Sequence, residues 1–302
     1  MQNEDAPQPA GPDRLAPGLY IVATPIGNLE DITLRALRIL RQANLIACED
    51  TRHTQKLLNH FDIKTRTQSY HQHNEAARAE ELVERVAQGE AVALVSDAGT
   101  PGISDPGERV IRAAVKRGLN VVAVPGPSAM ISALIASGVS TETFRFAGFL
   151  PARSGERRTA LESFANSPET LIFYEAPHRL LEALADLQSA FGPEREIVIA
   201  RELTKVHEEF LRGPIRDVFA SLSARGAVKG EITLIVAGKP PGSAAEPPQP
   251  SLKDRMKELM EAKSLDENAA LKQAAREFGI SKSEAYREWQ RIRKPKAGPR
   301  ER

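Results

Sequence analysis

The sequence predicts an α/β protein with a mainly parallel sheet, a second α/β domain, and a C-terminal helical module. Short apolar runs alternate with helical patterns over the first half of the chain. A glycine-rich loop, residues 96–107, joins the apolar run 91–95 to a helical pattern that begins at Glu108. A proline-rich stretch precedes three short amphipathic patterns near the C-terminus. Ligands of such sheets bind where loops leave the carboxyl ends of the strands.

The first α/β domain is expected over residues 18–138. Asp31 is expected to cap its first helix. A helical pattern follows each apolar run, which is typical of a parallel sheet covered on both faces. Its strands are predicted at residues 19–23, 45–48, 66–70, 91–95 and 121–124.

The second α/β domain is expected over residues 139–238, where strands follow one another more closely and antiparallel pairing is expected. A basic helix is predicted at 153–164, and Pro177 and Pro214 fall where helix starts tolerate proline. The strands are predicted at residues 144–149, 171–174, 197–201, 207–212 and 232–237.

The chain ends are expected to differ from these domains. Residues 1–17, rich in Pro, Gln and Ala, are predicted to be a disordered leader, and residues 239–250 a linker. Helices at 252–262, 268–278 and 284–292, within a module spanning 251–295, resemble a helix-turn-helix unit before a basic tail at 296–302. Generic three-helix packing explains the same pattern.

Composition narrows the class of protein. With 41% hydrophobic and 27% charged residues, the 302-residue chain is expected to be soluble and globular. No apolar run approaches the roughly 20 residues of a membrane span, and no signal peptide is evident. A single cysteine, Cys48, indicates a reducing, cytoplasmic location. Residues 251–302 carry a net charge of +5 and the rest −4, which favours an anionic partner for the C-terminal part.

Five motifs together identify a resemblance. They are TPIGNLED (24–31), EDTR (49–52), SYHQHNE (69–75), SDAGTPGISDPG (96–107) and VPGPSA (124–129). They resemble the ribosomal RNA small subunit methyltransferase I family, the 16S rRNA cytidine 2′-O-methyltransferases. These enzymes have the tetrapyrrole methylase (class III methyltransferase) fold. The resemblance covers about residues 18–238, and the C-terminal helices look like that family's helix-turn-helix extension.

The resemblance implies S-adenosylmethionine in a cleft between two α/β domains, 16S rRNA of the small ribosomal subunit as partner, and a homodimer. It implies neither a metal nor a membrane. The cofactor-binding residues that it implies are Pro25, Gly27, Asn28, Ser96, Asp97, Ala98, Gly99, Thr100, Ile103, Ser128, Ala129 and Tyr174.

The residue types themselves suit this chemistry less specifically. Asp97 could accept hydrogen bonds from ribose hydroxyls or an ammonium group, or simply cap its own loop. The glycine-rich loops would also suit a nucleotide phosphate, but neither of the two common phosphate-binding glycine motifs occurs. Methyl transfer to a hydroxyl also needs a base. The candidate bases are Glu49 and, if burial lowers its pKa, Lys205, which is otherwise a phosphate contact or a surface lysine.

The remaining candidates are substrate or RNA contacts. Glu49 belongs to a polar cluster at a strand end, which a local helix cap explains as well. His71 and His73 lack a third metal ligand, so RNA contact or loop bonding is expected rather than zinc. The predicted substrate and RNA residues are Asp50, Arg52, His53, His71, His73, Glu175 and Arg201.

Two further features allow an RNA-binding interpretation. Arg153, Arg157 and Arg158 lie on one predicted helix, and aromatic residues alternate along the strand 144–149, where packing in the core is the more usual reason. Two other functions remain open: a tetrapyrrole methyltransferase of the same fold, which would have no use for a basic helical module, and a non-catalytic RNA-binding factor.

Overall fold

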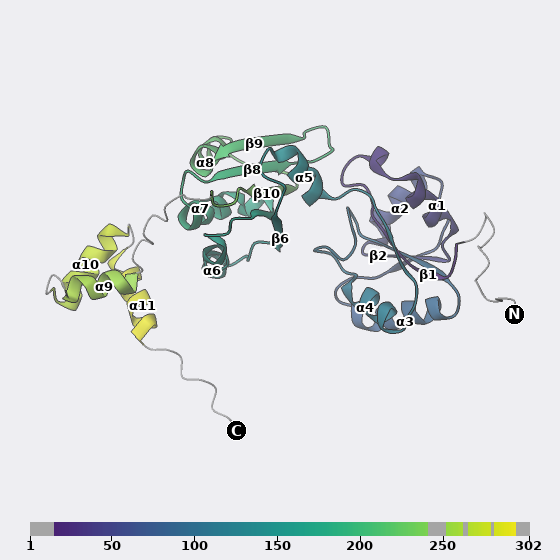
Figure 1. Cartoon of the computed structure of the whole chain (residues 1–302), viewed down its shortest axis with the longest axis horizontal. Helices are drawn as coiled ribbons and strands as arrows, with labels where there is room; N and C mark the ends of the chain where they lie inside the picture. Colours follow the sequence, from purple (N-terminus) through teal and green to yellow (C-terminus); the bar gives the residue numbers. More distant parts are fainter. Residues whose placement is uncertain (1–14, 241–251, 262–264, 279–280, 294–302) are drawn as a thin grey trace, which may run out of the picture. The chain divides into compact units, whose positions relative to one another are not determined.

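The structure is a computed structural model that describes residues 15–240, 252–261, 265–278 and 281–293 (Figure 1). It divides into two compact units at Pro240, and each is described by itself. Most of the predicted leader and linker, the glycine turn at Gly279 and the basic tail lie outside the described residues.

The first sheet is entirely parallel, as the sequence predicts, with the strand order β3-β2-β4-β1-β5. β4 and β1 therefore lie side by side in its centre. The strands are β1 (Gly18–Val22), β2 (Leu45–Cys48), β3 (Thr67–Ser69), β4 (Ala91–Val95) and β5 (Val121–Val124). The helices that alternate with them are α1 (Leu34–Gln42), α2 (Thr51–His60), α3 (Glu75–Ala87) and α4 (Glu108–Lys116).

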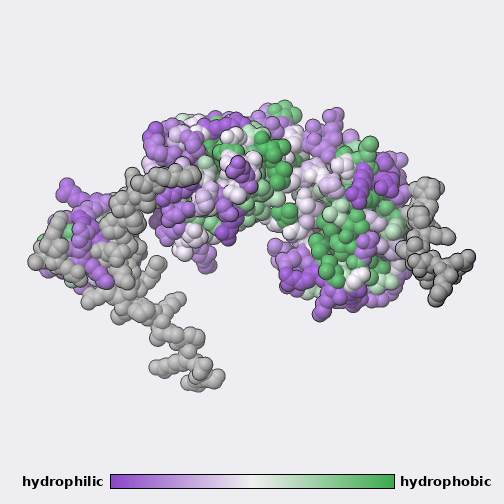
Figure 2. Space-filling view, viewed as in Figure 1, coloured by the Kyte–Doolittle hydropathy of each residue, from purple (hydrophilic) through white to green (hydrophobic). Residues whose placement is uncertain are grey.

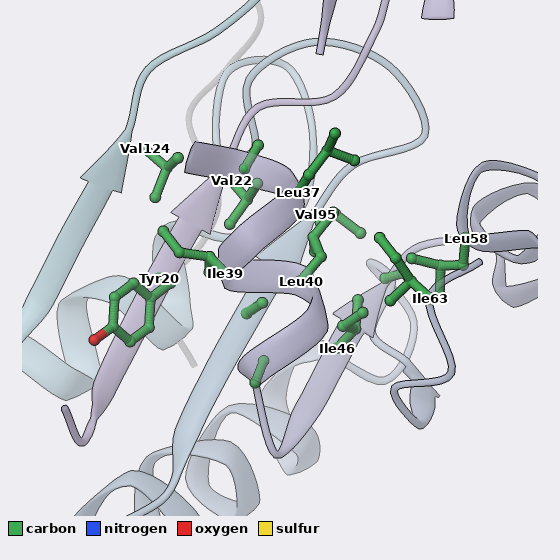
Figure 3. Packing of buried hydrophobic residues seen from close by; sticks show 14 of the residues in the cluster. Tyr20, Val22, Leu37, Ile39, Leu40, Ile46, Leu58, Ile63, Val95 and Val124 are labelled. Carbon is green, nitrogen blue, oxygen red and sulfur yellow. The ribbon is translucent and has the colours of Figure 1, made fainter. Parts of the chain in front are cut away.

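Both faces of this sheet are buried, which is why its strands are almost continuously apolar. Along β1, Tyr20 and Val22 point to the core under α1, whereas Leu19 packs in a second core under α3 and α4. Figure 3 shows the first of these cores, where Leu37 and Leu40 of α1 pack over the sheet. Because successive residues of β1 point to opposite faces, α1 covers one face of the sheet, and α3 and α4 cover the other.

The prediction that Asp31 caps the first helix is wrong. Asp31 ends a short 3-10 turn, η1 (Leu29–Asp31), and the backbone is extended at Ile32. Thr33 caps α1 instead, because its hydroxyl oxygen accepts a hydrogen bond from the Ala36 N–H at 3.0 Å. The helix therefore begins two residues later than expected, because the 3-10 turn comes first.

The second sheet is mixed, with the strand order β6-β7-β10-β8-β9. Only β6 and β7 are parallel, so the predicted antiparallel pairing is confirmed. Its strands are β6 (Phe144–Phe149), β7 (Thr170–Glu175), β8 (Glu196–Arg201), β9 (Glu209–Pro214) and β10 (Ile232–Val236). One face is covered by α6 (Ser154–Phe164), α7 (Leu180–Phe191) and α8 (Ile215–Ser223), with the short η2 (Pro177–Arg179) before α7.

Helix α5 (Ala129–Ser137) follows the first sheet in sequence but packs on the second one. Ala133 and Leu134 are buried against Ile235 of β10 and its neighbours. The Arg212 guanidinium of β9 donates to the Ala136 carbonyl oxygen at 2.6 Å, which satisfies the helix end. The helix is apolar on nearly every side, and Ile131 and Ile135 are exposed. Figure 2 shows hydrophobic surface in the region where Figure 1 draws α5. The predicted domain boundary at 138 remains a prediction.

The expectation that the β6 aromatics are core residues is wrong for two of them. Phe144 is 40% exposed and Phe149 54% exposed. The register between β6 and β7 shifts between Phe146 and Phe149, and Gly148 has a φ of +68°. This bulge interrupts the alternation and leaves the Phe149 ring exposed beside Tyr174, with ring centroids 5.6 Å apart.

The basic helix α6 is partly structural. Arg157 is 1% exposed, and its Nε donates to Asp186 Oδ2 of α7 at 2.7 Å. Arg158 donates to the other oxygen of the same carboxylate, whereas Arg153 is exposed. Arg157 therefore holds α6 to α7 and is not available to RNA.

The second unit contains the predicted three helices, α9 (Leu252–Glu261), α10 (Glu267–Glu277) and α11 (Lys282–Arg293). They share a small core that includes Met256, Leu271 and Trp289. Asp266 caps α10 by accepting a hydrogen bond from the Ala269 N–H. Throughout the described part of the chain, no helix is long and apolar enough to cross a membrane.

Candidate active site

Five loops leave the carboxyl edge of the first sheet, one after each strand, and those after β1, β2, β4 and β5 reach the site. The loops after β1 and β4 are joined by a two-way backbone bridge between Thr24 and Gly99, with N···O distances of 2.9 and 3.0 Å. The buried Ser96 hydroxyl donates to the Gly99 carbonyl oxygen at 3.3 Å. Thr100 Oγ1 donates to the Pro127 carbonyl oxygen of the loop after β5. These bonds fix three of the loops against one another.

The loop after β4 adopts an unusual backbone conformation. Gly99, Gly102 and Gly107 have positive φ, and so does the non-glycine Ser104, at +62°. A Cβ on Gly107 would lie 3.1 Å from the Gly102 nitrogen. The Gly107 N–H donates to Glu75 Oε1 of α3 at 3.2 Å, so the far end of the loop is also anchored. A positive φ at a residue with a side chain stores strain, which is common at functional sites.

The loops of the two sheets touch at Gly27. A Cβ there would meet the Lys205 side chain at 2.5 Å and the Leu203 carbonyl oxygen at 3.0 Å. Ile26 and Leu203 belong to one buried apolar cluster. Glycine at position 27 is therefore required by the close approach of the loop after β8.

A cleft of about 430 Å³ opens between these loops and the second sheet. This volume is in the range of small-molecule sites. The second sheet contributes lining residues from the end of β7 and the start of β10. These two ends lie side by side because Glu175 pairs with Ile232 in the antiparallel register. Of the residues predicted to bind the cofactor, those that line the cleft are Asp97, Ala98, Gly99, Thr100, Ile103, Ser128, Ala129 and Tyr174.

The other predicted cofactor residues support the loops without lining the cleft. Ser96 is buried, and Gly27 packs on the loop after β8. Asn28 caps η1 by accepting from the Glu30 N–H, and Pro25 is half-buried in the same loop.

The predicted substrate residues divide in the same way. Glu175 lines the cleft, and so does the candidate base Glu49. Asp50 caps α2, accepting from the Arg52 N–H at 2.8 Å, which is the local role that the sequence left open. The others, none of which lines the cleft, are Arg52, His53, His71, His73 and Arg201.

These remaining residues have other surroundings. Arg52 lines a separate surface hollow with Gln55 and Lys56 on α2. The His71 and His73 rings contact each other at 5.9 Å. Arg201 pairs with Glu209 of the neighbouring strand. No group of three or more potential metal ligands occurs among the residues that the structure describes.

Lys205 is poorly suited to the role of a base. Its ammonium group lies 2.8 Å from Glu202 and 3.2 Å from Glu231, a cleft residue. Partial burial lowers the pKa of Lys205, but hydrogen bonds to these two carboxylates outweigh it and raise the pKa above its ordinary value. The ammonium therefore stays protonated at neutral pH.

Several cleft residues were not anticipated from the sequence, among them Ser104, Asp105, Phe149, Leu203 and Glu231. Asp105 lies within the same glycine-rich loop as Asp97, so a search for further carboxylates in that loop would have found it. The second-sheet residues become neighbours only through the mixed strand order.

Three carboxylates from two loops meet in the cleft without a basic partner. In the described part of the chain, no lysine, arginine or histidine forms an ion pair with Glu49, Asp97 or Asp105. Burial, and then the charge of Asp97, raise the pKa of Glu49. Burial, and then the charges of Glu49 and Asp97, raise the pKa of Asp105 to about 6. The cleft is thus strongly acidic and suited to a cation.

Comparison with known proteins decides the family. Residues 18–218 match the family model of tetrapyrrole (corrin/porphyrin) methylases. A ribosomal RNA small subunit methyltransferase I from Synechocystis is 46% identical over 89% of this chain and 95% of its own length. One from Halalkalibacterium halodurans is 47% identical over 89% and 93%. The chain belongs to the ribosomal RNA small subunit methyltransferase I family.

The resemblance seen in the motifs is therefore confirmed, and so is the class III methyltransferase fold. Uroporphyrin-III C-methyl transferase from Thermus thermophilus, solved in complex with S-adenyl homocysteine, has a TM-score of 0.52 at 18% identity. The match covers 73% of this chain and 97% of that one. At this identity the likeness concerns the fold alone. Membership of the methyltransferase family confirms S-adenosylmethionine as the cofactor.

The charge, the apolar lining and the glycine backbone of the cleft suit this cofactor. S-adenosylmethionine carries a sulfonium and an ammonium group, and the Asp97 carboxylate of the cleft complements this positive charge. Ile26, Ile103 and Leu203 give the cleft apolar surface of the kind that an adenine ring needs. Gly99 lets the backbone of the loop after β4 approach a ligand closely.

Proposed function

We propose that this protein transfers a methyl group from S-adenosylmethionine to the ribose 2′-hydroxyl of a cytidine in 16S rRNA. The observation that carries this proposal is the acidic cleft between the two sheets in a chain that matches rRNA methyltransferases over nearly nine-tenths of its length. The relatives' names support rRNA as the substrate. The nucleotide and the 2′ position rest on the resemblance of the motifs.

The chain's residues would hold the cofactor from two sides. The loops after β1, β4 and β5 supply backbone groups and Asp97, and Tyr174 and Leu203 close the second side. When bound, the cofactor supplies an activated methyl group. Fixing a hydroxyl in line with that group supplies much of the rate enhancement, up to about 7–11 kcal/mol of the barrier.

RNA requires contacts beyond the cleft, because the cleft carboxylates repel phosphates. Arg52 and Lys56 line the hollow on α2, and neither pairs with a carboxylate in the described part of the chain. The exposed Phe149 ring offers a stacking surface for a base at the cleft itself. A single unstacked nucleotide could then enter the cleft while the rest of the RNA stays bound at the hollow that Arg52 and Lys56 line.

The C-terminal unit supports the same proposal through its composition, since residues 251–302 carry a net charge of +5. Such a unit would add affinity for RNA that is independent of sequence. The homodimer and the cytoplasmic location remain predictions from the resemblance and from cysteine usage.

The proposal is tested with full-length protein and radiolabelled S-adenosylmethionine. The acceptors are small ribosomal subunits lacking the modification, their extracted 16S rRNA, and uroporphyrinogen III. We expect label in the rRNA of the subunits or in the free rRNA, recovered as 2′-O-methylcytidine. Label only in the tetrapyrrole would favour the small-molecule alternative. Binding of rRNA with no transfer to any acceptor would favour the non-catalytic alternative.

A further inference from the structure

The second half of the loop after β4 lies on the side of the cleft toward the second sheet. Its first half is bonded to the loops after β1 and β5, through Gly99 and Thr100. Its second half instead approaches the second sheet, where a Cβ on Gly148 would lie 3.7 Å from the Ser104 hydroxyl. Asp105 lies in this second half and lines the cleft with the exposed Phe149 ring.

Asp105 is held in place by the backbone around it. Ser104 before it has a φ of +62°, Pro106 follows it, and Gly107 is anchored to Glu75. Proline fixes its own φ and restricts the residue before it, so the Asp105 backbone has little freedom. A carboxylate on a strained, anchored loop is preorganised for a specific contact.

Four groups face Asp105 in the cleft. They are the carboxylates of Glu49 and Asp97, the Ser96 hydroxyl and, across the cleft, the Tyr174 ring. Burial is the largest cause that raises the pKa of Asp105 to about 6, followed by the charges of the two carboxylates, while the nearby Ser96 hydroxyl opposes this increase. A general base works best with a pKa near the working pH.

An independent observation shows that this cleft is built for a ligand with hydrogen-bond donors. Glu175 lines it and is 2% exposed. Its Oε1 accepts from the Ala176 N–H and from Arg179, whereas its buried Oε2 has no hydrogen-bond partner. Leaving a buried carboxylate oxygen unpaired is costly, so the free protein keeps an acceptor that a bound molecule would satisfy.

We propose that Asp105 is the general base that removes the proton from the ribose 2′-hydroxyl. This inference rests on the proposed function. In the reaction the 2′-oxygen forms a bond to the methyl carbon as the bond from sulfur to that carbon breaks. The hydroxyl proton moves to the Asp105 carboxylate, from which it returns to water after the products leave.

The other candidate bases are less suited to this step. Lys205 is protonated by its ion pairs with Glu202 and Glu231. Burial and the charge of Asp97 raise the pKa of Glu49, but the nearby His71 opposes this increase. Glu49 instead acts on Asp105, as a negative neighbour that strengthens its affinity for a proton.

The test measures single-turnover methylation of small ribosomal subunits against pH, with cofactor affinity measured separately. The wild-type rate should rise with pH and level off above about pH 6. Asp105→Asn should lose about 100-fold or more of the plateau rate and the pH dependence, while cofactor affinity changes less than about threefold. Asp105→Glu should recover part of the rate, and Glu49→Gln should move the rising limb to lower pH.

The control is Asp62→Asn, an exposed aspartate outside the cleft, which should leave rate and pH profile unchanged. An Asp105→Asn rate within threefold of the wild type would overturn the assignment, and so would loss of the rising limb in Glu49→Gln. Absence of transfer by the wild-type protein would instead contradict the proposed function. The two failures are thus distinguishable.

Discussion

Replacing Asp97 with alanine is expected to weaken S-adenosylmethionine binding by about 30-fold or more. Asp97 lines the cleft between Glu49 and the Gly99 backbone and has no basic partner in the described part of the chain. A cationic or hydroxyl-bearing ligand would supply its hydrogen bonds. Loss of a hydrogen bond to a charged group costs about 2–3 kcal/mol, which is the expected change in affinity. Isothermal titration calorimetry measures it directly.

A second variant separates cofactor contact from loop structure. Asp97 Oδ1 also accepts a hydrogen bond from the Asp50 N–H at the start of α2, at 3.1 Å. Asp97→Asn keeps a carbonyl oxygen for this bond but removes the charge. If the charge binds the cofactor, both variants lose affinity. Wild-type affinity in Asp97→Ala, with the fold intact, would refute a cofactor contact at this residue.

Replacing Asp186 with alanine is expected to destabilise the protein by about 3–5 kcal/mol. Arg157 is buried, and Asp186 is its closest charged partner at 2.7 Å. The variant would leave the guanidinium buried without that charge, which is among the costliest single changes in a protein interior. Chemical denaturation followed by circular dichroism measures the free energy of unfolding.

The matched control is Glu182→Ala. Glu182 also approaches Arg157, at 3.5 Å, but its side chain is exposed, so its loss should cost less than about 1 kcal/mol. Equal destabilisation by the two variants would contradict the account of this ion pair.

The Asp186 contribution should also depend on pH. Burial raises the pKa of Asp186, but hydrogen bonds from Arg158 and Arg157 outweigh it and hold the pKa below its ordinary value. The stabilisation is therefore fully present above the ordinary aspartate pKa of about 4 and is lost as the pH falls through the lower folded value. The wild-type advantage over Asp186→Ala should shrink below pH 4.

The first sheet could be predicted well because local patterns determine it. Its inner strands β1, β2 and β4 are apolar, its connections are helical, and the parallel order brings the loops after β1 and β4 to one edge. The family resemblance of the motifs, rather than this pattern, named Asp97, Gly99 and Ser128 as cofactor residues, and all three line the cleft.

The residues that the second sheet contributes to the cleft could not be predicted from local patterns. Glu175 and Ile232 are 57 positions apart in sequence and meet only because β10 inserts between β7 and β8. The bulge at Gly148 turns Phe149 into the cleft against the simple alternation of its strand. Arg157 looked like a nucleic-acid contact because its buried partner, Asp186, is 29 residues away.

The most direct measurement is mass spectrometry of 16S rRNA nucleosides from cells with and without this gene. The proposed function predicts that deletion removes one 2′-O-methylcytidine, and that the gene restored on a plasmid brings it back while an Asp97→Ala copy does not. An rRNA nucleoside profile that is unchanged by the deletion would contradict the assignment of rRNA as the substrate.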